Sequence, residues 1–207
     1  MGAKESLLAT IEAHYVPGTA VTVDVDNAVK AAAKTLEEGA SEPDLIAHPT
    51  AVNGVWQLRF DSRNLLHESA NMARMSGGML PEQTITIANT FQELYGPEEG
   101  KPGFYRNTMV MEQKSVGFFY QSTASFTVDP EAPNVFQVSF STTSFVPLNA
   151  SDGPGAVRAA LNMPAQMPMH HVQSPPIGPF PSLVTYLDDT LRINRGADYI
   201  AVLERMA

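Results

Sequence analysis

Apolar and polar residues alternate along most of the chain after residue 52, which is the pattern of strands with one buried face. The clearest example is VFQVSFSTTSF, in which Phe136, Val138 and Phe140 share one face. Such runs are rich in β-branched and aromatic residues, and Gly, Pro, Asn or Asp residues bound them. They predict strands at 53–60, 83–94, 104–114, 117–128, 134–146, 184–194 and 199–205.

The first forty residues follow a different period, with apolar residues three or four positions apart, as in amphipathic helices. One apolar stripe starts at Leu7 and stops before Pro17. A second stripe lies between Asp24, whose carboxylate is a predicted N-cap, and Gly39, a predicted helix end. Because both stripes are narrow, we expect two N-terminal helices that lie against a larger body.

Short connections between the predicted strands favour antiparallel pairing of consecutive strands. The segment from Lys114 to Gly117 has the length of a tight hairpin, and a β-bulge is expected near Ser122–Ala124. A meander of this kind closes into a barrel. The predicted fold class is therefore all-β dominated, an antiparallel β-barrel with N-terminal helices. One domain is expected over 1–207, with the helices in 1–40 and the barrel in 52–207.

Two segments interrupt the strand pattern. Residues 61–81 predict a short helix across a barrel end, with Gly77-Gly78 as its exit. Residues 148–182 are rich in Pro and Met and predict a long loop, with a short helix within 155–161. A compact domain rarely keeps so long an irregular connection without a function. Two interpretations of this loop stay open, a lid over a binding site and an inert surface loop.

Composition and charge exclude several classes of protein. The formal net charge of -9 argues against nucleic acid or an anionic membrane as an electrostatic partner. The chain contains no cysteine, which excludes disulfides and thiolate chemistry. It has no apolar run of about 18 residues, so no transmembrane segment is predicted. The N-terminus also shows no secretory signal.

No constellation of residues predicts a catalytic or metal site. The histidines lack the spacing of a helical metal pair; they are His14, His48, His67, His170 and His171. Adjacent side chains of an extended segment diverge, so His170 and His171 are not expected to share an ion. We therefore expect no catalytic residue, no metal ion and no cofactor.

The segment YLDDTLRINRG near the C-terminus and the only tryptophan, Trp56, suggest a closed barrel end. A tryptophan ring can fill the base of a small barrel, and an arginine from the last strands can stack on it. We predict that Arg192 stacks on Trp56, and that Asp188 or Asp189 compensates its charge. The alternative is an outward-facing hairpin whose ion pairs are solvated.

Two fragments resemble the plastid lipid-associated protein (PAP), or fibrillin, family. GVWQLRF resembles the start of that family's β domain, and YLDDTLRINRG followed by ADYIAVLER resembles its C-terminal signature. The signature residues carried onto this chain, with structural roles, are Gly54, Trp56, Tyr186, Asp188, Arg192, Arg195 and Gly196. The resemblance implies a lipocalin-like barrel that binds or sequesters apolar molecules, with peripheral association to lipid surfaces. Because no targeting segment is visible, a bacterial member in the cytoplasm is expected; a plastid location would require a transit peptide already removed.

The predicted function is non-enzymatic binding or sequestration of a hydrophobic small molecule, such as a lipid, an isoprenoid or a fatty acid-like molecule, inside the barrel. Candidate ligand-binding residues are Trp56, Phe91, Phe118, Tyr120, Phe126, Phe136, Val138, Phe140, Met167 and Phe180. Two alternatives stay open. One is an isomerase or cyclase acting on an apolar substrate, with Glu112, His67 and Arg106 as candidate groups. The other is a structural lipid-body-associated protein with a filled barrel.

Overall fold

The structure is a computed structural model of the 207-residue chain. The residues it describes are 2–16, 19–63, 80, 85–97, 101–149, 152–196 and 199–206. The helix predicted within 61–81, with its Gly77-Gly78 exit and His67, falls almost entirely outside the described residues.

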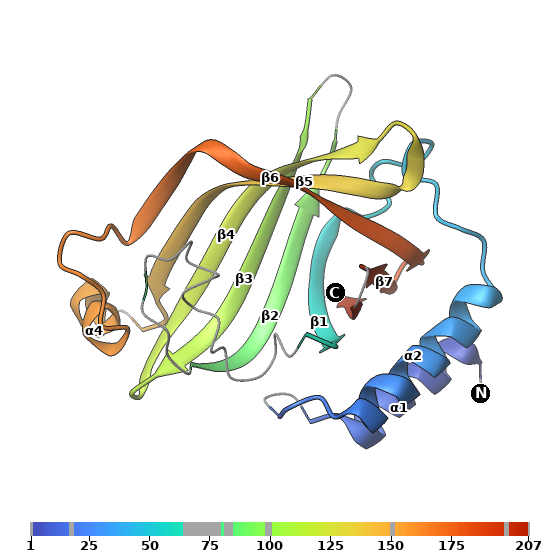
Figure 1. The fold of residues 1–207 in the computed structure, drawn as a ribbon, viewed down its shortest axis with the longest axis horizontal. Helices are drawn as coiled ribbons and strands as arrows, with labels where there is room; N and C mark the ends of the chain where they lie inside the picture. Colours follow the sequence, from blue (N-terminus) through green and yellow to red (C-terminus); the bar gives the residue numbers. More distant parts are fainter. Residues whose placement is uncertain are drawn as a thin grey trace.

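Eight strands among the described residues form a closed antiparallel barrel (Figure 1). Each strand pairs with the next along the chain, and β8 pairs with β1. The elements are α1 (Ala3–His14), α2 (Val23–Glu38), β1 (Gly54–Asp61), β2 (Thr86–Tyr95), β3 (Gly103–Gln113), β4 (Val116–Asp129), β5 (Ala132–Pro147), α4 (Gly153–Ala160), β6 (His170–Leu187), β7 (Leu191–Arg195) and β8 (Ile200–Arg205). The predicted fold class, an all-β dominated barrel with N-terminal helices, is confirmed.

The connection between β3 and β4 is the tight turn that the sequence predicts. Its two residues, Lys114 and Ser115, have φ values of 50° and 62°. Both lie in the left-handed region, which matches the twist of a two-residue hairpin. The register of β4 and β5 shifts between Thr123 and Ala124, so an irregularity is present at the level where a bulge was predicted, but the bulge is not in β4 itself. The extra residue lies on β5.

The prediction of a long loop over 148–182 is wrong for its second half, because residues 170–182 belong to β6. They pair with β5 in a ladder that runs from His170 to Leu183. Proline lacks the N–H of a ladder and is confined to edge positions, so the prolines concealed this strand in the sequence. Among the strands that the structure describes, the other side of β6 pairs with β7 only, from Leu183 onward. The proline-rich half is therefore an edge of the barrel wall rather than a loop or lid.

The strand predicted at 184–194 is two strands, β6 and β7, joined by a turn. The Asp188 carboxylate accepts hydrogen bonds from the backbone N–H groups of Thr190 and Leu191, each at 2.7 Å. An aspartate that binds the backbone two and three residues ahead stabilises a tight turn. The chain therefore reverses at a point that apolar alternation alone does not reveal.

Helices α1 and α2 pack side by side against the outside of the barrel (Figure 1). Gly39 ends α2 as predicted, but the N-cap is Thr22 rather than Asp24. Thr22 Oγ1 accepts a hydrogen bond from the backbone N–H of Val25 at 3.3 Å. The predicted cap is wrong because the threonine lies one residue ahead of the helix, whereas Asp24 lies within its first turn.

Two ion pairs attach these helices to the barrel. Arg195 of β7 forms a bidentate pair with Glu37 of α2, with N···O distances of 2.8 and 2.7 Å. Lys4 of α1 donates a hydrogen bond to the Asp188 carboxylate at 2.7 Å. Both partners on the barrel belong to the predicted signature, so these residues fix the helices onto the outer face near β7.

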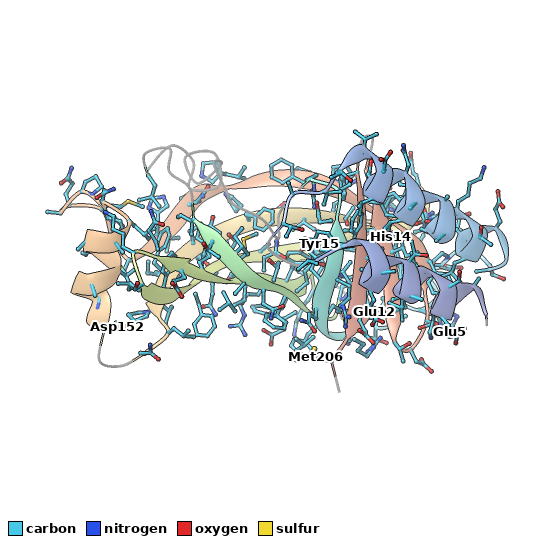
Figure 2. All side chains as sticks on the ribbon, turned by 90° about the horizontal axis from the view of Figure 1, so that it is seen from below. Glu5, Glu12, His14, Tyr15, Asp152 and Met206 are labelled. Atoms are coloured by element: carbon cyan, nitrogen blue, oxygen red, sulfur yellow. The ribbon has the colours of Figure 1, made fainter. Side chains whose placement is uncertain are left out.

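Helix α4 lies at the opposite end of the barrel from α1 and α2 (Figures 1 and 2). It confirms the short helix predicted within 155–161, and it begins at Gly153. Val157 belongs to the same buried cluster as Phe118, whereas Trp56 belongs to a different one. The barrel therefore has two cores, one at the α4 end and one beside α1 and α2.

Candidate functional site

A cavity of about 480 Å³ lies inside the barrel. Small-molecule sites typically measure about 300–1,000 Å³. Its apolar wall residues include Leu58, Met109, Val138, Phe140, Phe180 and Ala201. Its polar wall residues include Asp61, Arg63, Thr90, Gln92, Asn107 and Asn194. The interior is therefore amphipathic, whereas the sequence led us to expect walls of apolar side chains.

An irregularity in β1 places Asp61 in the cavity wall. Trp56 and Leu58 face the interior at alternate positions, so an unbroken strand would direct Asp61 outward. The register with β8 shifts between Leu58 and Phe60, and this bulge exchanges the two faces. Phe60 consequently meets Tyr15, next to α1, with ring centroids 5.4 Å apart, and Asp61 lines the cavity.

The Asp61 carboxylate is fully buried and paired with Arg63. Nε of Arg63 donates to Oδ1 at 3.0 Å and Nη2 donates to Oδ2 at 2.5 Å. The Arg63 backbone N–H also donates to Oδ1, at 2.7 Å. Burial alone would lower the pKa of Arg63, but the hydrogen bonds and charge of Asp61 raise it above its usual value. The Arg63 guanidinium is therefore charged, and each carboxylate oxygen of Asp61 already has donors.

Tyr199 covers this ion pair at the rim of the cavity. The guanidinium carbon of Arg63 lies 3.7 Å from the Tyr199 ring centroid, a cation–π contact. Gly196 provides the space for the ring, since a Cβ there would lie 2.1 Å from Tyr199 Cε1. Phe180 and Pro181 of the wall are exposed, so the cavity reaches the surface beside them.

Two buried wall residues keep a polar atom without a hydrogen-bond partner among the described residues. Thr90 of β2 is 3% exposed and its Oγ1 has no partner. Asn194 of β7 is 4% exposed; its Nδ2 donates to Ser182 Oγ at 2.8 Å, and its Oδ1 has no partner. Buried polar atoms are nearly always paired, so each unpaired atom calls for an explanation.

The base of the barrel is built around Trp56. Arg192 stacks on its ring with the guanidinium carbon 4.9 Å from the centroid, which confirms the predicted contact. Arg205 lies over the same ring at 4.3 Å, and its Nη2 donates to the carbonyl of Ala51 at 2.9 Å. The indole N–H donates to the carbonyl of Val52 at 2.8 Å. Sequence reasoning missed Arg205 because it considered only the YLDDTLRINRG arginines.

The predicted compensation of Arg192 by Asp188 or Asp189 is wrong. Asp188 binds Lys4 and the turn backbone, and Asp189 is exposed. Arg192 instead donates to the side-chain oxygen of Gln92. Its burial lowers its pKa to about 10, with Arg205 contributing further, so the guanidinium stays protonated at neutral pH. The barrel base therefore contains a buried positive charge that faces an amide and an aromatic ring.

The polar face of β7 points into the barrel. Arg192 and Asn194 share this face, and Asn194 lines the cavity. Leu191 and Ile193 lie on the other face and pack with the apolar residues of α1 and α2. Both faces of β7 are buried, so alternation alone cannot tell which of them is the inner one.

Other signature residues stabilise the turn between β6 and β7. The Tyr186 hydroxyl donates to the Asp188 carboxylate at 2.8 Å. Burial would raise the pKa of Asp188, but the hydrogen bonds from Lys4 and from the turn hold it well below its usual range. These contacts are structural, and they link the C-terminal hairpin to helix α1.

The predicted ligand-binding residues occupy three places. Val138, Phe140 and Phe180 line the cavity. Six others pack in the two cores: Trp56, Phe126 and Phe136 in one, and Phe118, Tyr120 and Met167 in the other. Phe91 follows Thr90 and precedes Gln92, both of which face the cavity, so it lies on the outer face of β2. The polar wall was missed, although the alternating Arg192 and Asn194 gave a signal for it.

The groups considered for an enzyme do not converge on the cavity. Arg106 pairs with Glu93, and Glu112 is exposed; neither lines the cavity. His67 lies outside the described residues. Within the described ranges, no group of three or more histidine, aspartate and glutamate side chains is placed to hold a metal ion.

An eight-stranded antiparallel barrel with an internal cavity defines a lipocalin-like barrel protein. The family model PAP_fibrillin matches residues 1–204, and the chain belongs to the PAP/fibrillin family. This membership and the barrel fit a lipid-associated protein. No curated protein and no solved structure is significantly similar to the chain. None of the helices that the structure describes has the length and apolar character needed to cross a membrane.

Proposed function

We propose that the protein binds or sequesters a hydrophobic small molecule in the barrel cavity, without converting it chemically. The observation that carries this proposal is the cavity itself, about 480 Å³ inside a closed barrel whose two ends are packed. A structural protein with a filled barrel would have no such space. The ligand class we propose is a lipid, an isoprenoid or a fatty acid-like molecule.

Burial of the apolar part of the ligand provides the affinity. Each fully buried methylene contributes about 0.8 kcal/mol, so sixteen contribute roughly 13 kcal/mol. Association costs at least about 4 kcal/mol, which leaves at most roughly 9 kcal/mol. That surplus corresponds to a dissociation constant of about a micromolar or slightly lower. Val138, Phe140 and Met109 are the side chains that such a chain would contact.

Peripheral association with a lipid surface is part of this proposal. Val172, Ile177 and Phe180 are large apolar residues on the exposed half of β6, and Phe180 also lines the cavity. Exposed apolar side chains beside a cavity mouth are suited to contact with lipid while a ligand enters. The net charge of -9 favours neutral lipid over an anionic surface.

The isomerase or cyclase alternative would require an acid or base in the cavity wall. Asp61 is a buried carboxylate in the cavity, and such a group is the usual candidate for a general base. Its oxygens, however, accept four hydrogen bonds from Arg63. A carboxylate whose oxygens are all occupied by one arginine suits a fixed wall group better than a proton acceptor.

Ala201→Phe tests the proposal, because Ala201 lines the cavity and the larger side chain fills it. Native mass spectrometry after gentle purification, with organic extraction, should show a bound lipid on the wild type and a loss of it in Ala201→Phe. The matched control is Ala88→Phe, which adds the same ring at an exposed position of β2. Equal ligand occupancy in Ala201→Phe and the wild type would contradict binding in the cavity.

A further inference from the structure

We propose that the cavity selects ligands that carry a hydroxyl group, which binds at Asn194 and Thr90. This inference rests on the proposed function and names the polar chemistry of the ligand. It starts from two polar atoms of the wall that have no hydrogen-bond partner among the described residues, Asn194 Oδ1 and Thr90 Oγ1. Both side chains are more than nine-tenths buried, so bulk water does not compensate them.

Asn194 is held in place by its neighbours. Its Nδ2 donates to Ser182 Oγ at 2.8 Å, which orients the amide and leaves the carbonyl oxygen available. On the barrel ladder Asn194 pairs with Ala201, and Ala201 pairs with Asp61. Three adjacent strands therefore place a small alanine between two polar side chains at one level of the wall. The alanine leaves room for a polar group of the ligand beside Asn194.

Thr90 adds a second polar atom on β2. A valine has nearly the same shape without the buried hydroxyl, which has no hydrogen-bond partner among the described residues and is therefore costly to bury. The Thr90 hydroxyl can both donate and accept, so it can pair with another hydroxyl in either sense. Its presence in the wall gives a polar ligand a second point of attachment.

The charges around the cavity favour a neutral polar group. A carboxylate has no hydrogen to donate to Asn194 Oδ1, and it would lie near a second carboxyl group, that of Asp61. An ammonium group would donate, but it would approach Arg63 in the wall and the positive Arg192 behind Gln92. An ether or ketone only accepts. A hydroxyl donates to the amide oxygen, accepts from other wall groups and carries no charge.

Three ligands of one chain length test this selectivity: a long-chain primary alcohol, its methyl ether and the corresponding fatty acid. Isothermal titration calorimetry on the full chain should show that the alcohol binds about tenfold more tightly than the ether, because the ether leaves the buried amide oxygen unpaired. The fatty acid should bind more weakly than the alcohol. Asn194→Leu should abolish the preference for the alcohol, and Thr90→Val should reduce it, while the affinity for the ether stays unchanged in both variants.

The outcomes separate this inference from the proposed function. Equal affinities of the wild type for alcohol and ether, or tightest binding of the fatty acid, would overturn hydroxyl selection and leave cavity binding intact. Failure of all three ligands to bind would overturn the proposed function instead. Thr90→Val preserves the shape of the side chain and is expected to fold, so it provides the test even where Asn194→Leu unfolds. An unchanged preference in Thr90→Val would remove Thr90 from the site.

Discussion

A Cβ atom at Gly54 would lie 3.1 Å from Nη1 of Arg205. The missing side chain at the start of β1 therefore provides the space in which Arg205 stacks on Trp56. Gly54 also has a φ of +126°, a conformation that residues with a side chain rarely adopt. Gly54 and Trp56, the first and third residues of GVWQLRF, thus both contribute to the position of Arg205. Gly54 leaves room for its side chain, and Trp56 provides the ring on which it stacks.

We expect Gly54→Ala to lower the free energy of unfolding by about 1–3 kcal/mol, through backbone strain and contact with Arg205. Urea-induced unfolding measures the change. Gly155→Ala is the matched control, because no heavy atom lies within 4 Å of a Cβ placed there. In helix α4 that substitution should leave stability unchanged or raise it by about 0.5 kcal/mol. Equal losses at the two glycines would contradict the role of Gly54.

Replacing Arg192 distinguishes packing from charge at the barrel base. Arg192→Ala should lower the free energy of unfolding by about 2–4 kcal/mol, because it opens a cavity and leaves Gln92 without its donor. Arg192→Met keeps most of the volume and removes a buried charge, but it also leaves Gln92 without its donor, so it should cost less than the alanine variant, about 1–2 kcal/mol. Chemical denaturation compares the two. A methionine variant as unstable as the alanine variant would show that the guanidinium itself is required.

The bidentate pair between Glu37 and Arg195 should contribute measurably to helix docking. Both side chains are largely buried, and Glu37→Gln should lower the free energy of unfolding by about 1–2 kcal/mol. The neighbouring Glu38 pairs with Lys34 at 3.6 Å in an exposed position. Glu38→Gln should therefore change stability by less than about 0.5 kcal/mol. Similar effects of the two substitutions in thermal unfolding would argue against a docking role for Glu37.

The contribution of Asp188 to stability depends on pH. Its pKa is lower in the folded protein than in the unfolded chain, so the ionised group stabilises the fold above the usual aspartate pKa of about 4. This stabilisation is lost as the pH falls through the folded value. Asp188→Asn retains a side chain that can form the turn. At neutral pH its free energy of unfolding should be about 1 kcal/mol lower than that of the wild type, since Asp188 is partly exposed and solvent screens its charge.

Unfolding curves of the wild type and Asp188→Asn, recorded from neutral to acidic pH, measure this dependence. The two proteins should converge in stability as the pH falls below about 4. A difference that persists unchanged in acid would mean that the carboxylate charge does not stabilise the turn.

Local patterns were sufficient for most of the architecture. Alternation located the strands of the meander, and the three-to-four-residue period located both N-terminal helices. The contact between Trp56 and Arg192 was also predicted from residue types. The first strand of a closed meander lies beside the last hairpin, so a large ring on one can contact an arginine on the other. The C-terminal signature correctly indicated the family. The strands and helices depend on short-range periodicity, which a chain carries in its order of residues.

The cavity wall was decided by tertiary structure. A bulge in β1 turns Asp61 inward, and the closed barrel with its external helices buries both faces of β7, so that Arg192 and Asn194 become interior residues. The proline-rich residues 170–182 form a strand because β5 supplies a partner along one side. Alternation divides a strand into two faces, but which face becomes the interior depends on bulges and on elements distant in sequence. The sequence therefore contains the polar residues of the wall but does not show that they lie close together. Only the closed fold brings them together around one cavity.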